Sequence, residues 1–285
     1  MNRLTGGATL FLRGSKLGLA GAALVAGTTL VAIFSPLFIP SSVIYGIHAV
    51  DQFLPPTWAH LFGTDVYGRD LFQLSLLAVS TDLQIAYLVT AASLVLGVLV
   101  GGIAGYSRPA IDEALMRITD IFLAIPSFIL AMAIAVVAGG GIFNTALALI
   151  VAIWPSYARI IRGQVIAEKN KLYIDSLRML NVGGSKILLR HIMPNVIYPV
   201  IAFLTIQVGV TILFLSGLTF IGFSSGPFTP ELGRMVSDGL NYFLQAPWLV
   251  VFPGMIISIL VFGFNLVGDG LREILDPRLK NAREV

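Results

Sequence analysis

The chain has 285 residues, of which 56% are hydrophobic and only 12% are charged, and its formal net charge is +3. This composition excludes an ordinary soluble globular protein and is typical of a polytopic membrane protein. The length accommodates several spans of about 20 residues with short loops, but no large soluble domain. The absence of cysteine excludes disulfides, thiolate metal ligands and a cysteine nucleophile.

The first membrane span is predicted directly after a basic tail, residues 1–16, which contains Arg3, Arg13 and Lys16. An uncharged run follows from residue 17 to residue 39. The apolar core of a signal peptide is shorter, about 7 to 15 residues, and ends at a cleavage site of small residues. We therefore predict a retained helix rather than a signal peptide.

Residues 40–82 are predicted to form the first external segment. It contains the sequence LFGTDVYGRDLF, whose turn-forming and charged residues are Gly63, Thr64, Asp65, Gly68, Arg69 and Asp70. By its chemistry alone, this stretch is a folded surface loop with a local ion pair. His48 and His60 also lie in this segment, but no third ligand accompanies them at a suitable spacing, so we expect no metal site.

Five further spans are predicted at residues 83–106, 121–137, 142–161, 196–215 and 248–267. Gly97, Gly101 and Gly105 recur at four-residue spacing in the second span. This pattern either lets another helix approach closely or reflects the tolerance of glycine in membrane helices. Charges at helical spacing between residues 108 and 120 predict a short amphipathic helix before the third span, which Pro126 is expected to kink.

The distribution of basic residues predicts the orientation of the six spans. Sixteen of the 18 lysine and arginine residues lie in segments assigned to one side, and only Arg69 and Arg234 lie in the external segments, 40–82 and 216–247. By the positive-inside rule both termini are then cytoplasmic, including a C-terminal tail at 271–285. The net positive charge follows from this topology, and we expect no nucleic-acid partner.

The sequence lacks the motifs and charged residues that several kinds of chemistry require. No charged residue lies in the middle of a predicted span, which argues against an ion-coupled carrier. The chain has no GxxxxGK[ST] phosphate loop, no HExxH zinc motif and no GxSxG elbow. We therefore expect a non-catalytic membrane subunit without a cofactor of its own, whose energy source is another protein.

The longest polar interval on the predicted cytoplasmic side is residues 162–195. Within it, Tyr173, Leu177 and Leu180 form one apolar stripe at helical spacing. The helix is predicted to end near residues 181–184, because Asn and Gly accept the left-handed backbone that closes helices. A second helix then leads into the next span. On chemistry alone, this hairpin either lies on the membrane surface or docks into a partner protein.

Four ordered stretches resemble the type I permeases of binding-protein-dependent ABC transporters. The sequence YIDSLRMLNVGGSKILLRHIMPN is similar to their EAA loop, and YARIIRGQVI is similar to the segment that leads into it. The sequence LFGTDVYGRDLF resembles a loop in the second-type permease subunits of dipeptide, oligopeptide and nickel importers, and APWLVVFPG through FNLVGDGLREILDPRL resembles their ending. The resemblance covers nearly the whole chain and implies an all-α fold with six transmembrane helices, residues 17–270.

The resemblance also implies that residues 173–184 form a coupling helix that sits in a groove of an ATPase subunit. The residues expected to take part are Tyr173, Ile174, Asp175, Ser176, Leu177, Arg178, Leu180, Asn181, Gly183 and Gly184. Asp175, Ser176 and Leu177 stand where the family usually has Glu, Ala and Ala, and Asn181 stands at the usual Gly. Leu177 adds bulk where a small residue usually packs.

The function implied is that of a permease subunit in an ATP-driven importer of di- or oligopeptides. A nickel or metal-chelate importer is the alternative cargo class, and an ATPase-independent channel or membrane scaffold is the alternative from another class. The partners implied are a second, homologous permease, two ATP-binding subunits that use ATP and Mg²⁺, and an extracytoplasmic substrate-binding protein. The implied location is a bacterial-type inner membrane. The sequence assigns no substrate-binding residues.

Overall fold

The computed structural model describes residues 16–226 and 228–275. Within these ranges the regular elements are helices, and the sole pairing of extended backbone is an isolated bridge between Thr64 and Asp70. The predicted basic tail up to residue 15 and the end of the predicted C-terminal tail, 276–285, lie outside the described residues.

The described chain is a bundle of long helices joined by short ones. The helices are α2 (Lys16–Phe38), α3 (Ser42–Tyr45), η1 (Ala49–Asp51), α4 (Leu71–Tyr106), α5 (Pro109–Leu123), α6 (Ser127–Ala138), α7 (Ile142–Lys169), α8 (Leu172–Met179), α9 (Gly184–Ile187), the π-helix η2 (Leu188–Ile192), α10 (Met193–Ile221), α11 (Leu232–Leu240) and α12 (Trp248–Leu275). In this part of the chain, five helices are long and apolar enough to cross a membrane, and α5 with α6 adds a sixth if the bent pair is one span. The all-α fold is therefore confirmed, with five or six candidate spans where six are predicted.

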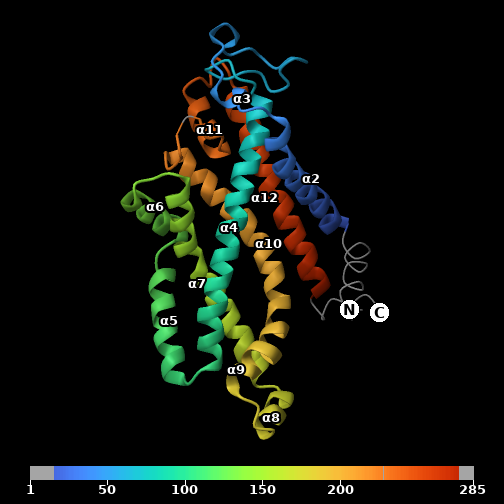
Figure 1. The fold of residues 1–285 in the computed structure, drawn as a ribbon, viewed down its shortest axis with the longest axis vertical. Coiled ribbons are helices and arrows are strands. Elements are labelled where there is room, and N and C mark those ends of the chain that lie inside the picture. The colour runs from blue at the N-terminus through green and yellow to red at the C-terminus, as the bar shows by residue number, and fades with distance from the viewer. Residues whose placement is uncertain (1–15, 227, 276–285) are drawn as a thin grey trace.

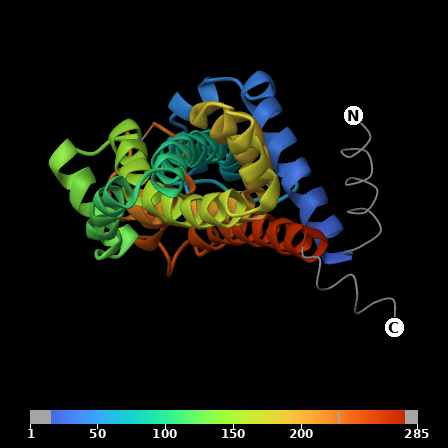
Figure 2. The same cartoon turned by 90° about the horizontal axis from the view of Figure 1, so that it is seen from below.

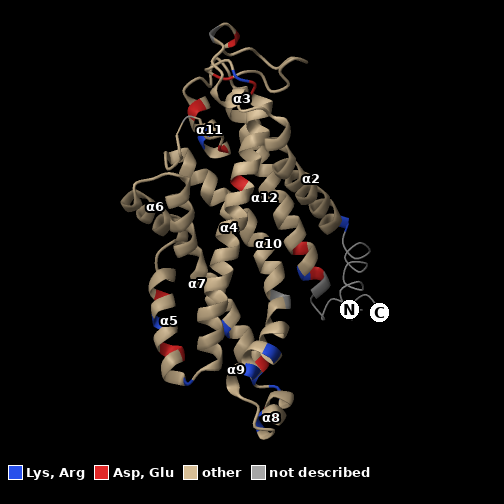
Figure 3. Cartoon of the chain, viewed as in Figure 1, with Lys and Arg blue, Asp and Glu red and all other residues tan. Residues whose placement is uncertain are grey.

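The short elements lie at opposite ends of the bundle. α3 and α11 lie at one end, and α8 and α9 project from the other end (Figure 1). The two segments predicted to be external meet at the first end, where the rings of Phe53 and Tyr242 pack with their centroids 4.8 Å apart. The indole Nε1 of Trp248, the first residue of α12, donates a 3.3 Å hydrogen bond to the carbonyl oxygen of Thr64 beside them. α2 lies along α12 at one flank (Figure 2). Charged residues lie mainly near the two ends, along α5 and on the last part of α12 (Figure 3).

Helix α4 begins well before the predicted start of the second span at residue 83. Its first residue is Leu71, and the side chain of Asp70 caps it by accepting a 2.9 Å hydrogen bond from the backbone N–H of Gln73. Asp82 is consequently buried inside the helix, where it accepts a 3.1 Å hydrogen bond from the backbone N–H of Leu232. The helix is therefore longer than the predicted span, because a carboxylate with a partner inside the protein does not mark a helix end.

The glycine stripe of α4 packs directly against α7. A Cβ at Gly101 would overlap the backbone carbonyl oxygen of Ala158, and one at Gly105 would lie 2.8 Å from Cβ of Val165. The backbones of the two helices approach this closely only because both positions lack a side chain. Of the two interpretations of the stripe, close helix packing is the one that the structure supports.

The predicted third span is two helices rather than one kinked helix. α5 and α6 meet at an angle of 83°, and Pro126 is the N-cap residue of α6. A proline disfavours helical geometry in the residue before it, so the chain breaks here instead of bending gently. α5 contains the charges whose spacing predicted an amphipathic helix. α7, in contrast, continues through Pro155.

Candidate functional site

The predicted coupling loop folds as a helix, a turn and a second helix. α8 ends after Met179, and Asn181 has a left-handed φ of 56°. The backbone N–H of Val182 donates to the carbonyl of Leu177 at 3.1 Å, and that of Asn181 donates to Arg178 at 2.9 Å. This pair of bonds is the Schellman pattern of helix ends, so the predicted turn at residues 181–184 is confirmed. The second helix begins at Gly184 and continues through η2 into α10.

One carboxylate connects the loop to two long helices. The hydroxyl of Tyr173 donates a 2.7 Å hydrogen bond to Oε1 of Glu168, near the end of α7. Nδ2 of Asn195, on α10, donates to the same oxygen at 3.1 Å, and Nζ of Lys171 lies 2.6 Å from Oε2. Burial, and then the hydrogen bond to Glu168, raise the pKa of the Tyr173 hydroxyl. α7, α8 and α10 are therefore held together at this point.

The apolar residues of α8 do not form the single outward stripe that their spacing predicted. Ile174 is fully buried, and Leu177 is half-buried against the core of the bundle. The most exposed apolar side chains of α8 and the turn after it are Leu172, Met179 and Leu180, which are 85%, 86% and 75% exposed. Leu177 packs on the core, and the hydroxyl of Tyr173 reaches Glu168 on α7 although the side chain stays 38% exposed. The surface available for docking is thus the tip formed by Leu172, Met179 and Leu180.

The remaining residues assigned to the loop have local roles. Asp175 and Arg178 form an exposed ion pair at 2.9 Å, and the hydroxyl of Ser176 donates to the carbonyl of Leu172. Gly183 is the N-cap residue of α9. A Cβ at Gly184 would lie 3.2 Å from the ring of Tyr106, so a small residue lets the loop approach the end of α4.

The external LFGTDVYGRDLF stretch is a closed turn around an ion pair. Oδ1 of Asp65 accepts hydrogen bonds from the backbone N–H groups of Tyr67 and Arg69, at 2.8 and 2.9 Å. Oδ2 of Asp65 lies 2.7 Å from Nε and 2.6 Å from Nη2 of Arg69, and each side chain is only 10% exposed. Arg69 also donates to the carbonyl of Ile44 at 2.9 Å. The prediction of a folded loop with a local ion pair is confirmed.

The other residues of this motif also bind within the protein. Gly63 and Gly68 have positive φ angles of 77° and 74°, a geometry that favours glycine. The Thr64 hydroxyl donates to the carbonyl of Asp51 and accepts from the backbone N–H of Leu54. Oδ2 of Asp70 lies 2.8 Å from Nδ1 of His60, in addition to its role as the cap of α4. The geometry of the motif is that of a structural junction.

Sequence comparison decides the family. Residues 97–281 match the family described as the binding-protein-dependent transport system inner membrane component. This chain belongs to that family. The matched range includes the close contact between α4 and α7 and the whole of the α8–α9 loop. The candidate coupling loop of this permease therefore lies within the part of the chain that matches the family.

Curated relatives extend the similarity to nearly the whole permease. It is 35% identical over 270 residues to the dipeptide transport system permease protein DppC of Alkalihalophilus pseudofirmus, covering 95% of this chain and 88% of that protein. It is also 35% identical over 274 residues to the oligopeptide transport system permease protein OppC of Bacillus subtilis, covering 96% and 89%.

A solved structure shares the fold of the permease. A chain of the MetNI methionine ABC transporter, in an inward-facing conformation, superposes with a TM-score of 0.53 at 20% identity, covering 72% of this permease and 98% of that chain. The permease is therefore a multi-pass inner-membrane component with the fold of ABC importer permeases.

Two parts of the site could not be found by sequence reasoning. Glu168 lies before the predicted coupling helix, and Asn195 lies at the start of the following span. Neither has a spacing signal that joins it to Tyr173, because the contact depends on how α7 and α10 cross. The exposed tip residue Met179 was also missed, since it lies off the predicted stripe.

Proposed function

We propose that this permease forms half of the transport path of an ATP-driven importer of di- or oligopeptides. Its relatives at 35% identity over nearly the whole chain are dipeptide and oligopeptide permeases, which supports this cargo class. The other half is a second, homologous permease. Two ATP-binding subunits supply energy from ATP and Mg²⁺, and an extracytoplasmic binding protein delivers the peptide.

The observation that carries the coupling role is the projecting α8–α9 loop (Figure 1). Its exposed tip of Leu172, Met179 and Leu180 suits helix-in-groove recognition, in which a short helix places apolar side chains in a partner's groove. The loop is also hydrogen-bonded to α7 and α10 through Glu168. A movement of the docked helix would therefore displace both long helices.

The orientation follows from the charge distribution. Lys169, Lys171 and Arg178 lie in α8 or within three residues of it, whereas Arg69 precedes α4 and Arg234 lies in α11, at the opposite end of the bundle (Figure 1). We place the α8 end in the cytoplasm by the positive-inside rule, which makes both termini cytoplasmic. ATP binding would close the ATPase pair and move α8, and the cavity between the two permeases would then open outward to receive a peptide.

Substitution of Leu180 by aspartate tests the docking role. Because this side chain is exposed, Leu180→Asp leaves the bundle intact, and we expect it to abolish both co-purification of the ATPase and ATP-driven peptide uptake. Leu244→Asp is the matched control, since Leu244 is 99% exposed at the opposite end. Leu177→Asp is also expected to uncouple transport, but it disturbs core packing as well. Normal uptake by Leu180→Asp would contradict the docking role.

A further inference from the structure

The second helix of the α8–α9 loop is not an α-helix throughout. Between α9 and α10 lies the π-helix η2, Leu188–Ile192, which we call the π-turn. The backbone N–H of Met193 donates to the carbonyl of Leu188, five residues earlier. In an α-helix its partner would be Leu189, four residues earlier. The π-turn therefore contains one residue more than an α-helical turn at this place.

The burial pattern on the two sides of the π-turn fits this extra residue. Ile187 and Ile192 lie five residues apart, and both are fully buried in the same hydrophobic core. In an α-helix, five residues turn through about 500°, which would place the two side chains about 140° apart. A turn closed by bonds between residues five apart instead brings them to the same side. The π-turn thus lets both residues pack on one core.

The helical hydrogen bonds are interrupted directly after the π-turn. The N–H of Met193 is engaged at Leu188, and the next residue, Pro194, has no N–H to donate. A side chain takes part instead, because Nδ2 of Asn195 donates to the carbonyl of His191 at 3.0 Å. Sharp bends in helices occur mostly at prolines and at π-turns. Here the two features coincide.

The predicted coupling helix α8 contacts the π-turn directly. The hydroxyl of Tyr173, which donates to Glu168, lies 3.3 Å from the carbonyl oxygen of His191. On the outer side of the turn, Leu189 is 69% exposed and Arg190 is also exposed. A displacement of α8 therefore acts on the π-turn from one side, and little packing on the other side opposes it.

We propose that the π-turn is the hinge on which the α8–α9 loop tilts relative to α10 when the ATPase moves the loop. The extra residue lets the helix bend at this place while the chain from α9 to α10 stays continuous. Tyr173 and Asn195 are positioning residues, since they hold the His191 carbonyl in the resting position. This inference rests on the proposed function, because a hinge needs a partner that moves the loop.

Deletion of one residue tests the hinge. Without Leu189, Ile187 and Ile192 are four residues apart, and such residues share one face of an α-helix. We therefore expect the deletion variant to fold and to retain the ATPase. We expect the number of peptides transported per ATP hydrolysed to fall at least about fivefold, the lower end of typical coupling between two sites. A ratio equal to that of the unsubstituted transporter would overturn the proposal.

Two controls separate a hinge from a local defect. Deletion of Leu213, another exposed leucine, removes a residue where α10 is a regular helix and turns one part of α10 away from its packing partners. We expect this deletion to lower the thermal unfolding midpoint, whereas deletion of Leu189 changes it little. Leu189→Ala keeps the extra residue and should transport normally. Equal falls in midpoint for the two deletions, or a coupling loss in Leu189→Ala as large as in the deletion, would contradict the hinge.

A distance across the π-turn reports its motion. The chain contains no cysteine, so spin labels on the purified permease attach only at introduced cysteines. Ser185→Cys and Ile201→Cys place labels at exposed positions on either side of the turn. In the assembled transporter, we expect the distance between the labels to change on ATP binding, and to stay constant when Leu189 is deleted. A constant distance with Leu189 present, or the same change without it, would refute the hinge.

The labelled transporter also distinguishes this inference from the proposed function. Peptide uptake with a constant distance refutes the hinge and leaves peptide import intact. A distance change on ATP binding without peptide uptake supports the hinge and refutes the proposed cargo class.

Discussion

The hydroxyl of Tyr173 on α8 donates a 2.7 Å hydrogen bond to the carboxylate of Glu168 near the end of α7. Asn195 of α10 donates to the same oxygen. Three helices that are separate in sequence thus share one acceptor at the base of the projecting loop. This arrangement gives the loop a defined position relative to the bundle, which a docking element needs if its displacement is to move the long helices.

Removal of the Tyr173 hydroxyl should weaken coupling without preventing docking. In Tyr173→Phe the ring remains, but the bond to a charged acceptor is lost, and such a bond contributes about 1.5 to 3 kcal/mol. We expect fewer peptides transported per ATP hydrolysed by the reconstituted complex. Ser176→Ala is the control, because its hydroxyl bonds only within α8. The same peptide-to-ATP ratio in both variants would show that the Glu168 contacts do not transmit motion.

The contact between α4 and α7 should not tolerate a side chain on the glycine stripe. A Cβ at Gly101 would overlap the backbone of α7, so Gly101→Ala should destabilise the bundle by about 1 to 3 kcal/mol. At Gly163, also in a helix, a Cβ would meet nothing within 4 Å, so Gly163→Ala should be neutral or stabilising by up to about 1 kcal/mol. Thermal unfolding in detergent measures both. Similar midpoints for the two variants would contradict the packing account.

The external ion pair should be important for stability. Removing one partner of a buried pair generally costs about 3 to 5 kcal/mol, so Arg69→Gln should lower the unfolding midpoint markedly. Arg178→Gln breaks an exposed pair on α8 and should cost no more than about 1 kcal/mol. The comparison is made by thermal unfolding of the two purified variants. An Arg69→Gln midpoint equal to that of Arg178→Gln would show that the motif does not hold the external end together.

Glu231, which precedes α11, should make stability at the external end depend on pH. Burial raises the pKa of this carboxyl from 4.5 to about 7, although the hydrogen bond from the Ser225 N–H and the charge of Arg234 oppose the shift. The folded protein therefore binds the proton more tightly than the unfolded chain. The stabilisation is present below about pH 4.5 and is lost as the pH rises through about 7.

The measurement is the unfolding midpoint between about pH 5 and about pH 8. We expect it to fall with rising pH in the natural chain and to change less in Glu231→Gln, whose side chain does not titrate. Asp82, Arg234 and Asp238 lie on the neighbouring segments and stay in place in this comparison. An unchanged pH dependence in Glu231→Gln would assign the effect to another group.

The sequence predicts the fold well where the signal is local. The apolar runs located the spans, and Asn181 marked the end of α8 because its left-handed geometry is a property of a single residue. The helix start at Leu71 was not predicted, because residues up to Asp82 were assigned to the first external segment. Its partner, the backbone of Leu232, is distant in sequence, so no local pattern could reveal that this carboxylate is satisfied inside the protein.

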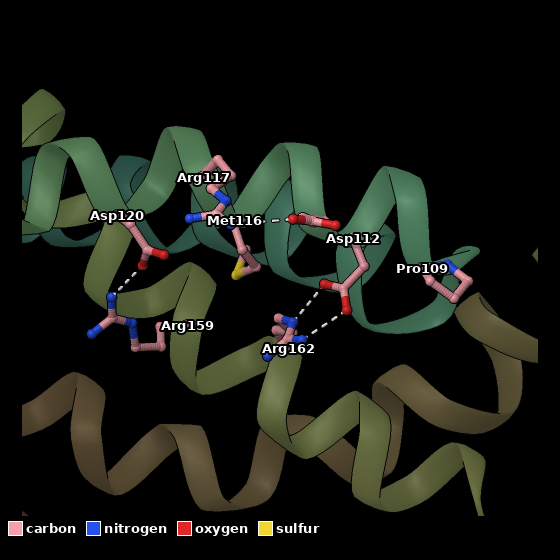
Figure 4. Close-up of a pocket in the computed structure, with 8 residues that line it drawn as sticks. Pro109, Asp112, Met116, Arg117, Asp120, Arg159 and Arg162 are labelled. Carbon is pink, nitrogen blue, oxygen red and sulfur yellow. Dashed lines mark hydrogen bonds and ion pairs between the residues drawn. The ribbon is translucent and has the colours of Figure 1, made fainter.

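The site was predictable only in part for the same reason. The spacing of Tyr173, Leu177 and Leu180 identified α8 as a helix but assigned all three to one outward face. In the structure Leu177 packs on the core, and Tyr173 is tied to Glu168 through its hydroxyl. The contact of Asp120 on α5 with Arg159 on α7 (Figure 4) could not be anticipated either, because the two residues are distant in sequence and meet only through the packing of α5 on α7.

The central claim is tested most directly by ATP-dependent uptake. The purified transporter is reconstituted in lipid vesicles with its ATPase and binding protein. The account predicts that a labelled dipeptide accumulates only when ATP and the binding protein are both supplied, and that other dipeptides compete while a nickel chelate does not. Uptake that proceeds without ATP would contradict the account in favour of a channel. Accumulation of the nickel chelate in place of the peptide would contradict the proposed cargo.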